Sequence, residues 1–500
     1  MSSVGVLIQN GMGVPVKKNS PAPKQEAIAR GVTVDYPYTA LGSVPDDPYF
    51  TGSWIHQRTN AAGAWNVSTG SPVTVAIIDT GFALDHEDLT NQWRTNTGES
   101  GTTAAGDSCW TGSPQNKSSN ACDDDQNGYV DDWRGWNFVN TTNNPQAGTT
   151  QENGIGAISH GTAVAGLAGA TTNNHIGIAS YNWNTKLLPL VALDDSGSGT
   201  TTSVLSAIYY AVDNGASIIN LSLGGPANDP ALDTAINYAY SRNVVVVAAA
   251  GNCGTTGDAG CGGMSAPVMM YPAKNNHVIA VGATDATDTR ASFSSYGPGI
   301  DVVAPGYGAL TSTLIDSRSE PYNYTNAYSA SLYGTSFASP IVSGIASLIR
   351  SIRPATSVDD ITALIDGSAT KTTGMNSQVY TNEYGHGVIN AGTAATIADA
   401  LSKSTDTVPK LAQTGDYRSE HSFSPSALMS SGCSTLSLSY CTVRMTNTLG
   451  YDRYLPYQKT SAAGTTGWQW SGTILQSGEW TLRATQGTMQ STNSYFLFSK

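Results

Sequence analysis

The chain has 500 residues, which is more than one compact domain usually holds, so two or three structural units are expected. Its formal net charge of −13 would repel phosphate, which argues against nucleic acid or an anionic membrane as a partner. No apolar stretch is long enough to span a membrane, and the 39% hydrophobic content is that of a globular protein.

The N-terminal segment, residues 1–46, carries few structural signals. Its opening, MSSVGVLIQNGMGVPVKK, has a short apolar run with no basic residue ahead of it, so no signal peptide is evident. A Pro/Lys stretch at 16–24 and an alternating run at 31–39 predict a tether followed by a single strand.

Residues 47–402 show the pattern of an α/β domain. Nearly continuous Val/Ile/Ala runs alternate with helical patterns, for example at 203–215 and 231–243. Such runs indicate buried parallel strands in a sheet flanked by helices. The runs are VTVAII from Val73, KLLPLV from Lys186, SIINLSL from Ser217, VVVVAAA from Val244 and VIAVGA from Val278.

A polar stretch at 402–409 leads into a β-rich C-terminal part, residues 410–500. Alternating segments and turn signals predict a small all-β accessory domain there. Its aromatic residues form either a core, which is the commoner case, or a binding face for a ligand that the sequence does not identify. These residues are Tyr454, Tyr457, Trp468, Trp470 and Trp480.

The six cysteines fall into three close pairs: Cys109 with Cys122, Cys253 with Cys261, and Cys433 with Cys441. None of the spacings is that of a zinc finger, and short-range disulfides are the simplest interpretation. The alternative is a set of buried thiols. Disulfides would place the chain in an oxidising compartment, so we expect a secreted, extracellular protein.

Two polar residues stand out in the α/β part. Asp79 ends the run VTVAIID, and the carboxyl ends of parallel strands are where α/β sheets place their sites, although an isolated Asp often only caps a turn. His160 opens HGTAVAGLAGA, whose small apolar residues predict a tightly packed helix that holds the imidazole rigidly at its start. The other histidines lie in polar or turn-like contexts.

Two further residues complete a catalytic set. Ser336, in GTSFASPIVSG, is predicted in the first turn of a helix, where free amides and the helix dipole favour negative charge. Asn252 follows the run VVVVAAAG and offers an amide that can stabilise an oxyanion. Each residue also has an ordinary structural interpretation: Ser336 could be a helix N-cap, and Asn252 could cap a turn. Together with Asp79 and His160 they supply nucleophile, base, orienting acid and oxyanion donor.

The order Asp, His, Ser differs from the Ser, Asp, His order of α/β-hydrolases, and no G-x-S-x-G motif is present. Peptide hydrolysis is therefore the leading hypothesis. A non-catalytic binding protein on the same scaffold is the alternative from another class, but no member of the set is missing. A preference for esters over peptides is the third hypothesis.

The segments DTG at Asp79, HGT at His160, AAAGN ending at Asn252 and GTSFASP around Ser336 resemble the signature blocks of the subtilisin-like serine peptidases, or subtilases. The similarity covers roughly residues 47–400. It implies an Asp79–His160–Ser336 triad in which Asn252 lines the oxyanion hole. It also implies polypeptide substrates and an inhibitory propeptide, for which residues 31–39 would supply the last strand.

The resemblance further implies that an extended substrate binds between two edge segments. One contains Gly197, Ser198 and Gly199, and the other contains Ser222, Leu223 and Gly224. Met270 stands where the family often has a small residue at the base of the first specificity pocket. We expect Met270 to fill that base and to favour smaller apolar substrate side chains.

The acidic stretch CDDDQNGYVDD contains a candidate calcium site. Asp123, Asp125 and Asn127 alternate ahead of the turn at Gly128, as at the start of a calcium loop, but Arg134 stands at the closing position. Asp131 or Asp132 must then close the site, and we assign Asp132. The resemblance implies a shortened loop of this kind with structural Ca²⁺, and the alternative is a solvated acidic turn.

Overall fold

The computed structural model describes residues 44–402, apart from 52, 151–155, 314–325, 377 and 379, and the backbone of short strands nearer both ends. The chain divides into two compact units, residues 1–42 and 43–500. In the first, β1 (Gly5–Gln9) and β2 (Met12–Val16) pair antiparallel. The sequence between them is Asn-Gly, the dipeptide most typical of a two-residue hairpin. The strand expected at 31–39 lies outside the described residues.

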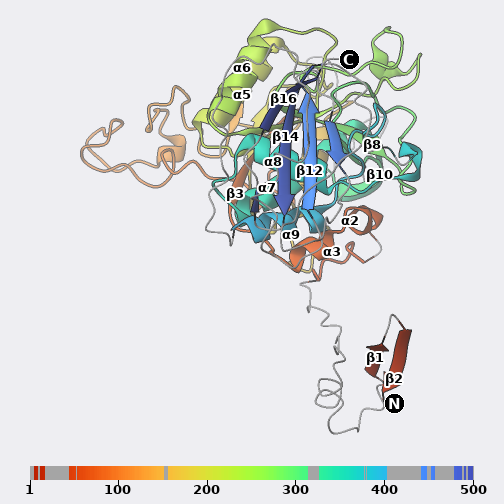
Figure 1. Cartoon of the computed structure of the whole chain (residues 1–500). Coiled ribbons are helices and arrows are strands. Elements are labelled where there is room, and N and C mark those ends of the chain that lie inside the picture. The colour runs from red at the N-terminus through yellow and green to blue at the C-terminus, as the bar shows by residue number, and fades with distance from the viewer. Residues whose placement is uncertain are drawn as a thin grey trace. The chain divides into compact units, whose positions relative to one another are not determined.

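A seven-stranded parallel sheet organises the second unit (Figure 1). Each of the five apolar runs read from the sequence overlaps one of its strands, so the predicted parallel sheet of an α/β fold is confirmed. In sheet order the strands are β4 (Trp136–Asn137), β5 (Thr185–Val191), β3 (Val73–Asp79), β6 (Ile218–Leu221), β7 (Val245–Ala249), β8 (Val278–Thr284) and β9 (Val302–Pro305).

Both faces of the sheet are covered, which explains why its strands are apolar throughout rather than alternating. In β3, Val75 and Ile77 join one hydrophobic core, whereas Ala76 and Ile78 join the other. The first core is closed by α3 (Ala61–Trp65), α4 (His160–Gly169), α7 (Thr335–Ile352), α8 (Val358–Ser368) and α9 (Ala391–Ser402). The second is closed by α5 (Thr201–Asp213) and α6 (Pro230–Ser241), which lie side by side (Figure 1).

Helix α4 is the buried helix that the sequence predicted. Every residue from Gly161 to Gly169 is buried, and all but Thr162 are Gly, Ala, Val or Leu. A neighbouring hairpin, β10 (Tyr307–Ser312) with β11 (Tyr328–Tyr333), leads directly into α7. The remaining short helices are α2 (Trp54–Arg58) and the 3₁₀ turns η1 (Lys117–Ser119), η3 (Ala259–Cys261) and η4 (Thr373–Met375).

The C-terminal strands form a separate antiparallel sheet of five strands, in agreement with the all-β prediction. The domain boundaries at 402 and 410 stay a prediction. Trp468, Trp470 and Tyr457 lie outside the described residues, as do the side chains of Tyr454 and Trp480. The strands are β12 (Cys441–Asn447), β13 (Asp452–Leu455), β14 (Gly478–Gln486), β15 (Met489–Gln490) and β16 (Ser494–Phe498).

Two of the three expected disulfides are formed, Cys109–Cys122 and Cys253–Cys261. Cys433, a member of the third pair, lies outside the described residues. Within the part of the chain that the structure describes, no helix combines the length and apolar character needed to cross a membrane.

Candidate active site

Three of the predicted site residues lie at the carboxyl edge of neighbouring strands. Asp79 is the last residue of β3, Ser222 directly follows β6, and Asn252 comes shortly after β7. These strands are adjacent in the sheet, so their carboxyl ends meet at one edge. The topology therefore brings together residues that are far apart in the sequence, at the place where α/β sheets bind ligands.

Asp79 and His160 form a direct pair. His160 Nδ1 donates a hydrogen bond of 2.7 Å to Asp79 Oδ1, and Asp79 is fully buried. The glycine after the histidine makes this approach possible, because a Cβ at Gly161 would lie 2.5 Å from the backbone oxygen of Gly81 and 3.3 Å from Asp79. The HGT motif is thus explained by close packing of α4 against the end of β3.

The environment of His160 raises its pKa above the ordinary 6.5. Burial alone would lower the pKa, but the negative charge of Asp79 and the hydrogen bond to it outweigh burial. The imidazole is therefore a stronger base than a free histidine, and its neutral form dominates only above this raised pKa. About a quarter of the His160 side chain, 24%, remains exposed, so a substrate can reach it.

Ser336 is the second residue of α7, as the sequence predicted. Backbone N–H groups in the first turn of a helix have no intrahelical acceptor, so the Ser336 N–H is available to a ligand. Gly334 caps the helix with a φ of 149°, a conformation that side-chain-bearing residues rarely adopt. The glycine before Thr335 and Ser336 is therefore required by the sharp entry into the helix.

Pro340 leaves the backbone carbonyl of Ser336 without its usual donor within the helix. A proline inside a helix cannot donate to the carbonyl four residues earlier, which here belongs to Ser336. Ser222 Oγ donates to that carbonyl instead, at 2.7 Å. The edge segment that contains Ser222 is thereby attached to the first turn of α7.

Asn220 is a positioning residue that the sequence analysis missed. It is fully buried in β6, and its Oδ1 accepts hydrogen bonds from Ser339 (2.8 Å) and Ser343 (2.9 Å) of α7. Its Nδ2 donates to Ser222 Oγ at 2.9 Å. The signal was present in the sequence, since Asn220 is the only polar residue of a strand whose four residues are all buried.

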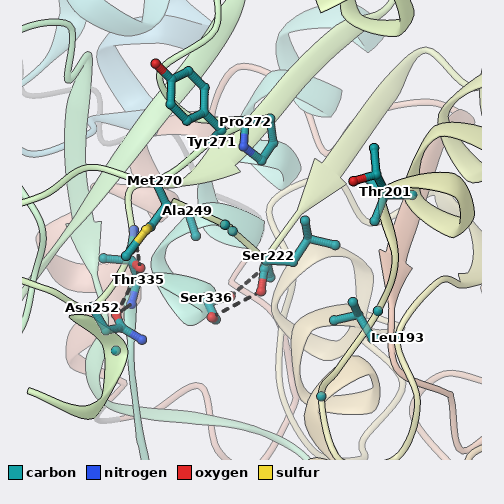
Figure 2. A pocket seen from close by; sticks show the side chains of 18 of the residues that line it. Leu193, Thr201, Ser222, Ala249, Asn252, Met270, Tyr271, Pro272, Thr335 and Ser336 are labelled. Carbon is teal, nitrogen blue, oxygen red and sulfur yellow. Dashed lines mark hydrogen bonds between the residues drawn. The ribbon is translucent and has the colours of Figure 1, made fainter. Parts of the chain in front are cut away.

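Asn252 is held by the segment that carries Ser336. Its Oδ1 accepts hydrogen bonds from both the backbone N–H and the hydroxyl of Thr335, each 3.0 Å long (Figure 2). The other end of the amide, Nδ2, makes no hydrogen bond to a described residue. It is therefore left as a donor beside the cavity that Asn252 lines.

The hydroxyl of Ser336 does not bond to His160 in this structure. Ser336 Oγ donates to the backbone oxygen of Ser222 at 3.2 Å (Figure 2). His160, Asn252 and Ser336 nevertheless border the same two cavities. Catalytic hydrogen bonds often form only when substrate is bound, and a bond from Ser336 to His160 would require the hydroxyl to leave the Ser222 carbonyl.

The larger cavity, about 420 Å³, contains nearly all of the predicted substrate-binding residues. Ser198 is the exception, because it does not line the cavity and its backbone N–H donates to Asp194 Oδ1 at 2.9 Å. A smaller cavity of about 190 Å³ lies on the side of Tyr333 and Phe337. The predicted substrate-binding residues that line the larger cavity are Gly197, Gly199, Ser222, Leu223, Gly224 and Met270.

Met270 lines the larger cavity together with Gly224 and Gly251. Its side chain packs so closely that a Cβ at Gly224 or at Gly251 would lie 2.7 or 2.6 Å from it. Met270 is also buried against the Cys253–Cys261 disulfide. Figure 2 shows it beside Asn252 and Thr335, away from Leu193 and Thr201. Met270 thus lines the cavity beside Gly224 and Gly251, and its role at the base of a specificity pocket stays a prediction.

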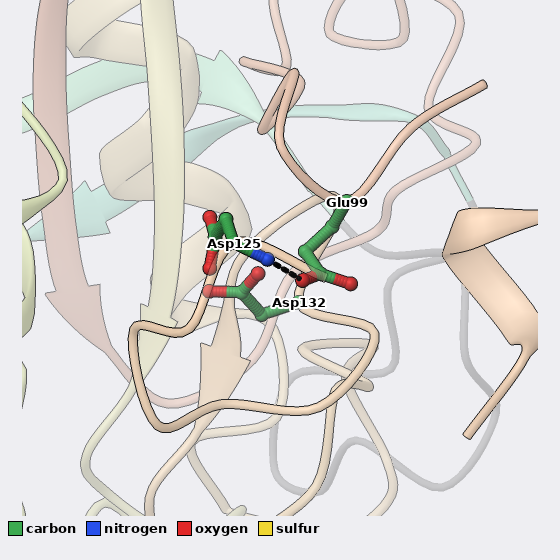
Figure 3. A group of neighbouring side chains, drawn as sticks. All are labelled: Glu99, Asp125 and Asp132. Atoms are coloured by element: carbon green, nitrogen blue, oxygen red, sulfur yellow. Dashed lines mark hydrogen bonds between the residues drawn. The ribbon is translucent and has the colours of Figure 1, made fainter. Parts of the chain in front are cut away.

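An acidic cluster lies apart from these residues. Glu99, Asp125 and Asp132 point toward one another, with carboxylate oxygens within 4.8 Å (Figure 3). Two of the predicted calcium ligands, Asp125 and Asp132, are in the cluster, and Glu99 is a member of it that the sequence analysis did not single out. Asn127 Nδ2 donates to Asp132 at 2.9 Å, and Asp123 accepts the backbone N–H groups of Asn127 and Gly128.

The chemistry of this cluster fits a hard cation. Glu99 is fully buried, and one of its oxygens, Oε2, has no hydrogen-bond partner. Burial, and then the charges of Asp125 and Asp132, raise the pKa of Glu99 to about 7, and burial also raises the pKa of Asp132. Carboxylate oxygens gathered in this way are the ligands that Ca²⁺ prefers. A lone Glu outside the acidic stretch gave no signal in the sequence.

Comparison with known proteins gives consistent matches. A model of the Subtilase family matches residues 70–387. Thermitase from Thermoactinomyces vulgaris is 37% identical over 67% of this chain and 94% of its own length. Subtilisin DY from Bacillus licheniformis is 40% identical over 47% of this chain and 77% of its own length. The solved structure of a protease from Pseudoalteromonas arctica PAMC 21717 covers 71% of this chain and 100% of its own, with a TM-score of 0.54 and 26% identity.

Proposed function

The chain belongs to the subtilase family, and from that premise we propose that it is a serine endopeptidase in which Ser336 is the nucleophile, His160 the general base and Asp79 the group that orients the base. The observation that carries the proposal is the 2.7 Å hydrogen bond between buried Asp79 and His160, beside a cavity that Ser336 also lines.

The chemistry follows from this arrangement. Ser336 Oγ attacks the scissile carbonyl and passes its proton to His160 Nε2, while Asp79 stabilises the imidazolium through Nδ1–H. The oxyanion that forms accepts hydrogen bonds from Asn252 Nδ2 and the backbone N–H of Ser336. His160 then protonates the leaving amine, and water releases the acyl group from Ser336 by the reverse steps.

Ser336 and His160 border both cavities, so the scissile bond would lie between the two. We assign the acyl side of the substrate to the larger cavity, which residues of both edge segments line, and the leaving side to the smaller one. An extended polypeptide would then lie between the segment at Gly197–Gly199 and the segment at Ser222–Gly224. Binding as an added strand relies on main-chain hydrogen bonds, which suits many sequences. Side-chain selection is left to the pockets, above all to the one that contains Met270.

The proposal is tested by incubating the calcium-supplemented protein with an unstructured polypeptide and identifying the cleaved bonds by mass spectrometry. We expect cleavage at internal bonds, with small apolar residues preceding the scissile bond. A folded protein that cleaves no internal bond would overturn the assignment.

Replacing Met270 with glycine is expected to change this preference. The change removes the side chain that packs against Gly224 and Gly251, so the pocket deepens. The ratio of kcat/KM for a Phe-containing over an Ala-containing peptide anilide should rise by about 10-fold or more, since a few methylenes in an apolar pocket are worth that much. An unchanged ratio would show that Met270 does not limit the pocket.

We further propose that Glu99, Asp125 and Asp132, with Asn127 nearby and Asp123 holding the turn, bind a structural Ca²⁺. The support is the buried, unpartnered oxygen of Glu99 and the mutual repulsion of carboxylates, which a divalent cation would relieve. The ion would stabilise the loop in its folded conformation and takes no part in peptide hydrolysis.

Chelation of calcium is therefore expected to lower the melting temperature, and Glu99→Gln should shrink that difference. Binding at 100 times Kd is worth about 2.7 kcal/mol. The measurement is thermal unfolding with calcium or EDTA, in a Ser336→Ala background to prevent self-digestion. Because Glu99 has a pKa of about 7, protons compete with the cation, and the calcium effect should weaken as the pH falls through that value.

The matched control is Glu383→Gln, since Glu383 is an exposed glutamate outside the cluster. The Glu383→Gln protein should retain the whole calcium-dependent shift in melting temperature. If Glu99→Gln retains it as well, the cation binds elsewhere.

We also propose secretion, with residues 1–46 including part of an inhibitory propeptide, 47–402 the catalytic domain and 410–500 an accessory domain. Two formed disulfides support an oxidising compartment. Detection of the mature chain in culture medium would test this assignment.

A further inference from the structure

The loop that carries Asn252 is long and has little regular structure. It connects β7, which ends at Ala249, with β8, which begins at Val278, and its only helical piece is the 3₁₀ turn Ala259–Cys261. Loops of this length without secondary structure need other interactions to fix their conformation. The position of the candidate oxyanion donor therefore depends on what holds this loop.

A disulfide forms the centre of the loop. Cys253, the residue directly after Asn252, is bonded to Cys261, and both are almost completely buried at 0% and 1% exposure. With Met270 they form a hydrophobic cluster separate from the two main cores. The cross-link thus begins one residue from Asn252 and packs against Met270, which lines the larger cavity.

The second half of the cross-linked segment returns to Asn252. Gly260 precedes Cys261 and lines the larger cavity. It packs against the backbone of Asn252 so closely that a Cβ at Gly260 would lie 2.5 Å from the Asn252 carbonyl oxygen. Since its backbone does not have a positive φ, close packing is the reason for glycine here.

Hydrogen bonds also hold the backbone directly after Asn252. Cys253 N–H donates to Ser295 Oγ at 2.9 Å, and Gly254 N–H donates to the carbonyl of Phe293 at 2.8 Å. These bonds anchor the two residues after Asn252, in addition to the packing of Gly260 and the disulfide. A test must therefore show whether the cross-link is needed in addition to them.

We propose that the Cys253–Cys261 disulfide is a positioning element of the oxyanion site, which holds Asn252 in place through its backbone and through Gly260. The inference rests on the proposed function. Its consequence is that loss of the cross-link lowers kcat through Asn252, although neither cysteine lines either of the two cavities.

The test is the double variant Cys253→Ala/Cys261→Ala, which avoids placing hydroxyl groups in a buried site. We expect kcat for a peptide anilide to fall by about 10-fold or more, with a smaller change in KM. The upper limit is the 10²–10³-fold that the whole oxyanion amide contributes in subtilisin. The control, with calcium in excess, is Cys109→Ala/Cys122→Ala, which removes the other disulfide and should leave kcat unchanged.

A double-mutant cycle separates positioning from a general loss of structure. In an Asn252→Ala background there is no amide left to misplace, so removal of the disulfide should change kcat by less than about 2-fold. Equal losses in both backgrounds would overturn the proposal, as would an unchanged kcat in the double cysteine variant. Equal losses would mean that the disulfide acts independently of Asn252. An unchanged kcat would mean that the hydrogen bonds of Cys253 and Gly254 hold Asn252 in place without the disulfide.

If the cysteine variant fails to fold, Gly260→Ala tests the same path with the disulfide intact. Its methyl group would displace the Asn252 backbone, so kcat should fall, and an unchanged kcat would contradict the proposal. A wild-type protein without turnover would instead contradict the proposed function, which keeps the two failures distinguishable.

Discussion

Replacing Ser336 with alanine is expected to lower kcat by about 10⁶-fold, the loss known for the nucleophile of subtilisin. The change removes the only group proposed to form the acyl intermediate, and the remaining oxyanion donors give limited catalysis on their own. Rates should be measured with a peptide anilide, and the fold checked by circular dichroism.

A matched control lies on the same helix. Ser351 is near the end of α7, where its hydroxyl donates to the Leu348 carbonyl, and Ser351→Ala should leave kcat unchanged. A Ser336→Ala protein that retains more than about a thousandth of wild-type kcat would require another nucleophile.

Replacing Asp79 with asparagine should lower kcat by about 10⁴-fold, as the equivalent change does in trypsin. Asp79 Oδ1 accepts the hydrogen bond from His160 Nδ1, and an amide in its place no longer selects the tautomer whose Nε2 is free. The change also removes the charge that raises the pKa of His160, so burial, which lowers that pKa, is left unopposed.

The same substitution should also shift the pH dependence of activity. Only neutral His160 can act as a base, so wild-type kcat/KM should fall as the pH drops through a pKa above 6.5. In Asp79→Asn the residual activity should extend to lower pH. The control Asp85→Asn removes one carboxylate at an exposed position and should leave the pH profile in place. An acid limb at the same pH in both variants would mean that Asp79 does not control the base.

The sequence predicted the strands and helices well because each apolar run is long enough to specify a strand that is buried on both faces. It also placed Asp79, Asn252 and Ser336 correctly at the ends of their elements. Local sequence specifies these features, since a strand end and a helix start are recognised from adjacent residues.

The contacts between elements were not predictable in the same way. Glu99 joins Asp125 and Asp132 only after two loops fold together, and Asn220 bonds to Ser339 and Ser343 across the sheet–helix interface. Such pairings depend on tertiary packing, which one sequence does not reveal. The alternation within the acidic stretch indicated the loop that contributes Asp125 and Asp132 to the cluster, but it gave no sign of Glu99, which joins them from outside that stretch.

Reaction of the folded chain with a fluorophosphonate, followed by mass spectrometry of its peptides, tests most directly whether a hydroxyl, an imidazole and a buried carboxylate here act as one chemical unit. We predict a single phosphonyl adduct, located on Ser336 and lost in His160→Ala. A folded, calcium-supplemented protein that takes up no label, or takes it up on a different serine, would contradict this account.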